Sequence, residues 1–284
     1  MQNLILGTIV NYTWEDIEPF FSSYFKNSST NVDCTVFVKK ISKRTRKYLE
    51  NYNIEIINID DEYNEDWITE YRWRLYNEYL NHCCVDYANV LLVDVRDSFF
   101  QDNIFERCNG KKILFSKEVN DFANEKCNRE WIERRYGINV INSIKDYYPI
   151  CAGTIIGDFN YIKNLCENVV ENMDNTSYEY FKNCDQSIVN YLVYYKKIFI
   201  EDDIYWEYAC DNNIATVGLL NELTIKSNEV VNKDNYIPAL IHQYDRHKIL
   251  VKFVERKYCK RKGMVIRSFL KYRYLRAILK RTFL

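Results

Sequence analysis

The sequence predicts an α/β fold in which helices flank a mostly parallel sheet, with a basic helical segment at the C-terminal end. Short apolar runs typical of strands buried on both faces alternate with segments of helical spacing over residues 4–95. Such alternation is typical of βαβ units and therefore of a parallel sheet. Glycine and proline are scarce, at 7 and 3 of 284 residues, which argues against collagenous, linker-rich and disordered classes.

The first half of the chain contains most of the predicted strands. Residues 4–10 form a continuous apolar run, and Thr13 is an N-cap residue type at the start of the helical spacing that follows. The strand at 88–95 is apolar up to Asp94 except for Asn89. The predicted strands are 4–10, 34–38, 54–59 and 88–95, and the predicted helices are 14–25, 42–51 and 64–81.

The second half is less regular. Residues 149–157 form an apolar run interrupted by Gly153, and 238–244 is a strand or a loop. Helical spacing covers 159–173 and 183–195, whereas 117–148 has no clear pattern. Because no repeat or long linker interrupts the chain, we expect one domain over residues 1–250, followed by a separate basic segment over 251–284.

The net charge of −1 conceals an uneven distribution. Residues 252–284 contain twelve Lys or Arg residues and one acid, which leaves the rest of the chain at −12. Within this basic segment an apolar stripe has approximate helical spacing, and such a helix suits an anionic membrane surface. A partner-binding helix is an alternative; nucleic acid is not an expected partner because no known binding motif is present. The stripe consists of Val265, Phe269, Tyr272, Leu275, Leu279 and Phe283.

The N-terminal residues lack the features of a signal peptide, and no apolar stretch is long enough to span a membrane. We therefore expect a cytoplasmic protein, docked peripherally on the inner face of the membrane through residues 252–284.

Polar side chains follow two of the predicted strands. Asp94 and Asp97 follow the run at 88–95, and Asn11 with Tyr12 follows the first strand. Ligands of parallel sheets bind at the carboxyl ends of strands, and carboxylates there suit Mg²⁺ or Mn²⁺ bridging a diphosphate. The alternative is a solvated strand-to-loop junction, where acidic residues are common.

Five segments resemble, in the same order, motifs of the retaining family 8 glycosyltransferases, which have the GT-A (Rossmann-like) fold. The segments span about 240 residues. They are Asn11-Tyr12, the carboxylate strand that ends in Asp94, Cys151-Ala152-Gly153, the run from Asp185 to Asn190, and His242 with Lys248 six residues later.

The resemblance implies a role for each matching position. The metal ligands would be Asp94 and His242, with Asp97 as a candidate second carboxylate and Mn²⁺ or Mg²⁺ as the ion. The donor would contact Tyr12 by stacking on the base, Asn11 beside it, Lys248 at the diphosphate, and Ala152 and Gly153 at the sugar. Asp185 would hold donor-sugar hydroxyls and Gln186 would lie near the anomeric carbon. Arg74, preferred to Arg72, would offset donor charge.

Three segments depart from the family pattern. The second aspartate of the Asp-x-Asp motif aligns with Arg96, so either Asp97 supplies that carboxylate through a bulge or Arg96 replaces part of the cationic charge. Ile9 and Val10 stand where the family has acids near the base, so the UDP-sugar that the family favours is not required. Asp245 replaces a glycine in the segment between His242 and Lys248.

The sequence thus predicts a hexosyltransferase that moves a sugar, with retention, from a nucleotide-diphosphate sugar to a glycan or lipid-linked acceptor. A phosphatase of the haloacid dehalogenase type is one alternative, since Asp94 ends an apolar strand, but Arg96 occupies the position where that chemistry needs a second carboxylate. A non-enzymatic membrane adaptor with a degenerate GT-A site is the other, and Arg96 favours it.

Overall fold

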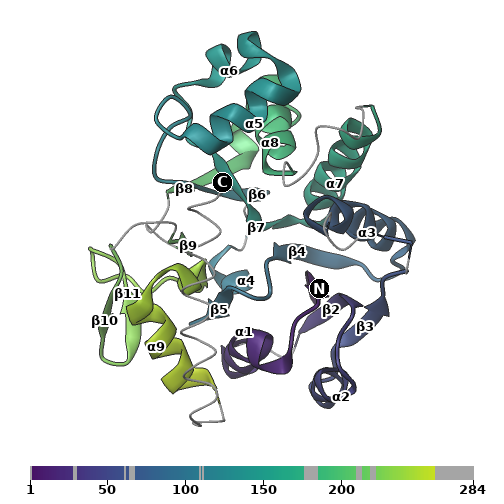
Figure 1. The fold of residues 1–284 in the computed structure, drawn as a ribbon, viewed down its shortest axis with the longest axis vertical. Helices are drawn as coiled ribbons and strands as arrows, with labels where there is room; N and C mark the ends of the chain where they lie inside the picture. Colours follow the sequence, from purple (N-terminus) through teal and green to yellow (C-terminus); the bar gives the residue numbers. More distant parts are fainter. Residues whose placement is uncertain are drawn as a thin grey trace.

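The central sheet of this computed structural model has seven strands in the order β3-β2-β1-β4-β7-β6-β8 (Figure 1). The structure describes residues 2–27, 31–60, 62–63, 68–108, 110, 112–175, 185–208, 213–217 and 222–259. The strands are β1 (Gln2–Val10), β2 (Val32–Lys39), β3 (Glu55–Asn58), β4 (Tyr87–Val93), β6 (Ile113–Lys117), β7 (Ile150–Asp158) and β8 (Ile204–Tyr208).

The sheet is mostly parallel, which confirms the predicted fold class. β1 pairs in parallel with β2 and β4, β2 with β3, and β6 with β8. β7 alone among these strands runs antiparallel, between β4 and β6. Its first residues therefore lie at the same edge of the sheet as the carboxyl ends of β1, β4, β6 and β8.

The apolar runs are continuous because the sheet is buried on both faces. Along β1, Leu4 and Leu6 point into one core, whereas Ile5 and Ile9 point into the other. Helices α3 and α7 pack in the first core and α1 and α2 in the second. The helical segments are α1 (Trp14–Asn27), α2 (Lys43–Asn51), α3 (Ile68–His82), α4 (Ile104–Arg107), α5 (Lys126–Tyr136), α6 (Ile138–Ile144), α7 (Phe159–Asp174), α8 (Asp185–Asn190), η3 (Tyr191–Lys196), η4 (Glu201–Asp203), η5 (Tyr244–Arg246) and α9 (Lys248–Tyr258).

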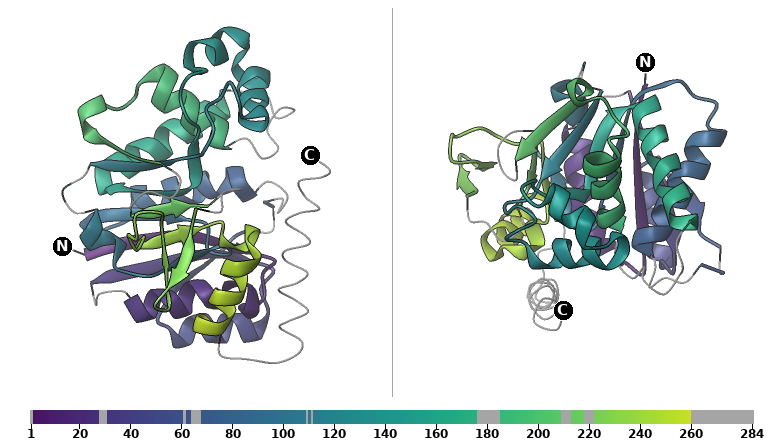
Figure 2. Two further views of the ribbon diagram at one scale, coloured as in Figure 1. Left: turned by 90° about the vertical axis from the view of Figure 1, so that its left-hand side faces the viewer. Right: turned by 90° about the horizontal axis from the view of Figure 1, so that it is seen from above.

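A smaller sheet beside the central one has the order β5-β12-β9, with β5 at Ser98–Phe100, β12 at Leu240–His242 and β9 at Ile214–Thr216. The predicted strand or loop at 238–244 is thus a strand, although only three residues long. A hairpin of β10 (Thr224–Lys226) and β11 (Glu229–Val231) lies near α9 (Figure 2). The predicted helix at 183–195 is α8 continued by the π-helical η3.

Helix α9 crosses the predicted boundary at residue 250. Its residues Leu250, Phe253 and Val254 are buried in a third core cluster, so the first turns of the basic segment pack against the body. Residues 260–284, which carry the predicted apolar stripe from Val265 to Phe283, lie outside the described residues. Among the described helices, none is long and apolar enough to cross a membrane.

Candidate metal and donor site

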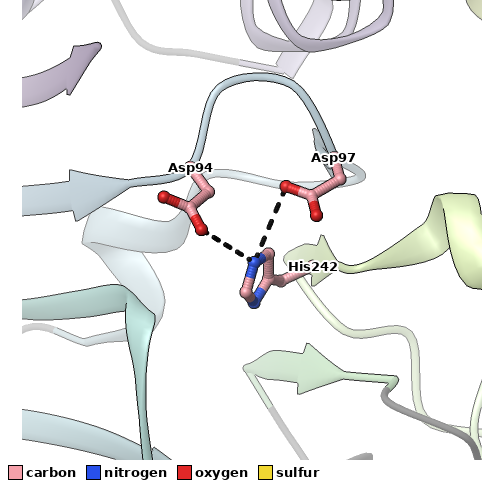
Figure 3. A group of neighbouring side chains, drawn as sticks. All are labelled: Asp94, Asp97 and His242. Carbon is pink, nitrogen blue, oxygen red and sulfur yellow. Dashed lines mark ion pairs between the residues drawn. The ribbon is translucent and has the colours of Figure 1, made fainter. Parts of the chain in front are cut away.

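Three side chains meet at the carboxyl edge of the central sheet (Figure 3). Asp94 and Asp97 follow β4, and His242 comes from a distant part of the chain. Nε2 of His242 lies 3.5 Å from Oδ2 of Asp94 and 3.7 Å from Oδ1 of Asp97. One ligand atom from each residue lies within 4.8 Å of the others. The expected convergence of the Asp94 and His242 segments is confirmed.

Two strand pairings position the three residues. Asp94 follows β4, and its N–H donates to the carbonyl oxygen of Gly153 on β7 at 2.8 Å. Asp97 immediately precedes β5, which pairs antiparallel with β12 so that His242 stands opposite Ser98. Because all residues of β5 and β12 are buried, this short ladder holds His242 beside the loop that joins β4 to β5.

The atom separations fit a divalent cation. Nε2 of His242 is buried and has no hydrogen-bond partner among the described residues, and 3.5 Å is long for a hydrogen bond to Asp94. Neighbouring ligands of an octahedral Mg²⁺ with bonds of about 2.1 Å lie about 3 Å apart. Only a small closure of the three groups is therefore needed to coordinate an ion. Carboxylates suit hard cations such as Mg²⁺ and Mn²⁺, and imidazole is a common ligand of transition metals.

Gly153 makes the convergence possible. A β-carbon built on Gly153 would lie 2.6 Å from Oδ2 of Asp94 and 2.7 Å from Nε2 of His242, and closer still to Cε1 of the same ring. Any side chain would therefore occupy the space between β7 and the two candidate ligands. The sulfur of Cys151, two residues earlier on β7, lies 3.5 Å from the other imidazole nitrogen, Nδ1.

Asp97 provides the second carboxylate of the cluster. The position two residues after Asp94, where the family motif has its second aspartate, is Arg96. Arg96 extends to the other oxygen of Asp97, at 3.3 Å, and to Oδ2 of Asp245, at 3.1 Å. Burial alone would lower the pKa of Arg96, but Asp97 and Asp245 outweigh burial and raise it. Two of the departures from the family pattern, Arg96 and Asp245, thus form an ion pair with each other.

Arg72 is the arginine of α3 that reaches the site, which corrects the sequence-based preference for Arg74. Its guanidinium binds Oδ1 of Asp94, Oδ2 of Asp185 at 2.5 Å and the carbonyl oxygen of Ala152 at 3.2 Å. Arg74, two residues further along the helix, points away from this cluster and pairs with the exposed Asp174 at 2.5 Å. Residues two apart on a helix face different directions, and the orientation of α3 decides between them.

The cluster has an excess of negative charge. Burial raises the pKa of Asp94, but Arg72 and His242 outweigh burial and hold that pKa well below its usual range. For His242, burial lowers the pKa, but Cys151, Asp94 and Asp97 outweigh burial and raise it well above its usual range. If His242 ligated a metal, its imidazole would be neutral, and the carboxylates would exceed the guanidinium groups by two, which equals the charge of one divalent cation. The carboxylates are Asp94, Asp97, Asp185 and Asp245, and the guanidinium groups are Arg72 and Arg96.

The predicted donor residues at the end of β1 lie beside the cluster. Asn11 has a left-handed backbone with φ of 56°, which Asn tolerates better than most residues, and it turns the chain after the strand. Tyr12 is partly buried, and its pKa is raised chiefly by burial; Arg96 opposes the shift, and Asp97 and Asp94 add to it. Tyr12 thus lies within electrostatic reach of both candidate aspartate ligands.

Gln186 and Asn190 are bound to the first residues of β7. Oε1 of Gln186 accepts from the N–H of Ala152 at 3.2 Å, and the side chain of Asn190 bonds both the N–H and the carbonyl of Ile150, at 2.7 and 3.1 Å. Asp185 accepts through Oδ2 from Arg72 and from Nε1 of Trp73, the latter at 3.0 Å. No described residue donates to its Oδ1.

Sequence reasoning missed Glu118, a carboxylate that follows β6. It accepts from Nε2 of Gln186 at 3.1 Å and from Asn128 at 3.0 Å. Burial raises its pKa, opposed by the hydrogen bond from Gln186 and by Arg246. No motif marks this position in the sequence. Lys248, at the start of α9, is exposed and makes no hydrogen bond or ion pair with the described residues.

Two solved structures share the fold described here. The apo form of the bifunctional glycosyltransferase WbbM has a TM-score of 0.55 and 13% sequence identity, covering 89% of this chain but 49% of that chain, so this chain spans about half of it. An active-site mutant of LgtC has a TM-score of 0.52 and 15% identity, covering 89% of this chain and 94% of that one.

This chain has the GT-A fold. No protein-family model matches its sequence, and no curated protein does. At such low identity the similarity establishes the fold, and the activity of this GT-A chain is argued from its site.

Replacing Gly153 with alanine in this GT-A chain is expected to lower the free energy of unfolding by about 1–3 kcal/mol, the usual cost of overpacking. The same substitution in a His242→Ala background is expected to cost less, because the imidazole supplies two of the three nearest atoms. Urea unfolding of the wild type, both single variants and the double variant measures the difference. An equal cost in both backgrounds would contradict the proposed contact.

Arg72→Met is expected to lower the free energy of unfolding by about 3–5 kcal/mol, because it leaves the buried Asp185 without its cationic partner. The matched control is Arg74→Met, which breaks a solvent-exposed pair and is expected to cost at most about 1 kcal/mol. Both values come from urea unfolding. Similar losses for the two variants would show that Arg72 does not stabilise the site.

Proposed function

We propose that this chain is a glycosyltransferase that transfers a sugar from a nucleotide-diphosphate sugar, with a UDP-sugar favoured, to a glycan or lipid-linked acceptor. The observation that carries the proposal is the group of Asp94, Asp97 and His242 at the carboxyl edge of a GT-A sheet. In such sheets this edge is where ligands bind. Mn²⁺ or Mg²⁺ held there would act as a Lewis acid toward the departing diphosphate.

The residues around the three ligands are arranged to bind the two halves of a donor. Tyr12 and Asn11, at the end of β1, offer an aromatic face and an amide for the base. Lys248 opens α9, two residues after η5. Its ammonium has no ion-pair partner in the part of the chain that the structure describes, and a free ammonium suits the diphosphate. These placements follow the resemblance to the family motifs and are part of the proposal.

The sugar of the donor is proposed to lie against the first residues of β7. Ala152 and Gly153 leave space there, and Gln186 is fixed by hydrogen bonds to Ala152, Glu118 and Asn128. Oδ1 of Asp185 remains for a sugar hydroxyl, because Arg72 and Trp73 both bind Oδ2. Arg72 is a positioning residue, since it acts through Asp94 and Asp185.

We further propose that transfer proceeds with retention, as in the enzymes whose motifs this sequence resembles. The acceptor hydroxyl would attack the same face of the anomeric carbon that the diphosphate leaves, and a phosphate oxygen would accept its proton. Gln186, held beside this position by three hydrogen bonds, is an amide and does not serve as a base.

Peripheral docking on an anionic, cytoplasmic membrane surface through residues 252–284 is also part of the proposal. Lys252 and Arg256, four residues apart on α9, are both exposed, while Phe253 and Val254 are buried in the body. The described part of the segment therefore presents cationic side chains on its solvent face, as binding to anionic lipid requires.

Uridine diphosphate with Mn²⁺ is expected to raise the melting temperature of the wild-type protein more than either does alone. Asp94→Asn and His242→Gln should abolish the metal-dependent part, because the first replaces a carboxylate by a neutral amide and the second removes the imidazole nitrogen. They should also reduce hydrolysis of a UDP-sugar by about 10²–10³-fold, the usual effect of losing a group that stabilises developing charge.

The matched control is Asp102→Asn, whose carboxylate binds Arg107 outside the cluster and which should behave like the wild type. Normal stabilisation by the metal and nucleotide in the Asp94 and His242 variants would contradict the assigned site. Intact nucleotide binding with no hydrolysis across a panel of nucleotide sugars would favour the adaptor function instead.

Proton NMR of the first-formed product is expected to show the anomeric configuration of the donor. The coupling constant of the anomeric proton distinguishes the two configurations before mutarotation. An inverted anomer would rule out retention but leave glycosyl transfer in place.

A further inference from the structure

Lys117 and Tyr208 lie next to the donor site but are not used by it. Lys117 ends β6 and is paired with Ile150 at the start of β7 and with Tyr208 at the end of β8. The next residue, Glu118, bonds both Pro149 and Gln186. Gly153 is three residue steps beyond Ile150 on β7, which corresponds to roughly 10 Å along the strand.

Among the described residues, the ammonium group of Lys117 has no anionic partner in direct contact. Lys117 is only 8% exposed, and its Nζ makes no hydrogen bond or ion pair with that part of the chain. It lies instead 4.1 Å from the ring centroid of Trp206 and 5.0 Å from that of Tyr208. Burial lowers its pKa, and the more distant Glu201 opposes that shift. Ring faces satisfy none of the three N–H donors.

The rings around Lys117 are held in place and one of them is open to solvent. Trp206 stacks on Tyr194 at 5.5 Å and donates through Nε1 to Glu201 at 2.9 Å. Tyr208 meets the edge of Tyr148 at 5.2 Å, yet 44% of Tyr208 remains exposed. A fixed aromatic surface beside one precisely placed charge is typical of a small-molecule subsite.

We propose that Lys117, Tyr148, Trp206 and Tyr208 form an acceptor subsite for a sugar that carries a negative charge. The C–H face of the sugar ring packs on the exposed surface of Tyr208, and its carboxylate or phosphate group binds the ammonium of Lys117. This inference rests on the proposed glycosyl transfer. Because the subsite is offset along β7 from Gly153, the anionic unit is not the sugar that is glycosylated but one further along the acceptor.

A direct binding experiment tests the subsite without turnover. Cellobiose, cellobiouronic acid and cellobiose 6′-phosphate share one skeleton, with the charge of the last two at the same end, and are titrated calorimetrically into the full chain with Mn²⁺ and uridine diphosphate present. One or both charged probes are expected to bind about 10- to 100-fold more tightly than cellobiose, the range of a hydrogen bond to a charged group. Which of the two binds more tightly distinguishes a carboxylate from a phosphate.

Three variants assign the effect to these residues. Lys117→Met should bring the charged probes to the affinity of cellobiose, whereas Lys117→Arg should keep the preference. Tyr208→Ala should weaken all three probes. Tyr195→Ala is the matched control, because Tyr195 is also 44% exposed but stacks on Tyr191 away from Lys117, and it should leave binding unchanged.

Equal affinity of the wild type for the charged and neutral probes would overturn the proposal, as would a Lys117→Met variant that folds normally and keeps the wild-type preference. Failure of the proposed function would show differently. The wild type would then lack metal-dependent binding of uridine diphosphate and hydrolysis of a UDP-sugar, whatever the sugar probes do.

Discussion

The close approach of Asp94 and His242 across Gly153 is the constraint on which the site depends. It requires β4, β7 and β12 to meet at one point, and it leaves no room for a β-carbon on Gly153. It also gathers carboxylates in a partly buried place, where like charges repel strongly. Arg72 and Arg96 offset this repulsion, each by bridging two aspartates.

The longest strands that the sequence predicted, β1 and β4, lie in the middle of the sheet and are mostly buried. β1 and β4 are continuous apolar runs because alternate residues enter two different cores. β8 is an edge strand with Tyr205 and Tyr208 exposed, so it has no such run. β5, β9 and β12 have three residues each, too few for any periodicity. Tertiary pairing, and not local pattern, determines these strands.

The sequence predicted the site residues that stand in a recognisable motif. It did not predict those whose role depends on which side of a helix or strand faces the site. Asp94, Gly153 and His242 stand in recognisable segments, and the structure brings them together. The choice between Arg72 and Arg74 depends on which face of α3 packs inward, and both residues fit the local pattern equally well. Glu118 follows a strand that the sequence did not reveal, so nothing marked it before the fold was known.

Two of the departures from the family motif, Arg96 and Asp245, compensate each other in charge. Arginine in place of an aspartate at position 96 removes one negative charge and adds one positive charge, while Asp97 and Asp245 each contribute one negative charge. Because Arg96 binds both of these aspartates, the substitution is neutralised locally. Asp97 keeps its other oxygen, Oδ1, directed at His242, at 3.7 Å. The net charge offered to a divalent cation is therefore that of the family motif, although the carboxylate comes from the next residue along the chain. In the proposed metal site, Arg96 is therefore part of a rearranged motif whose charge is balanced locally.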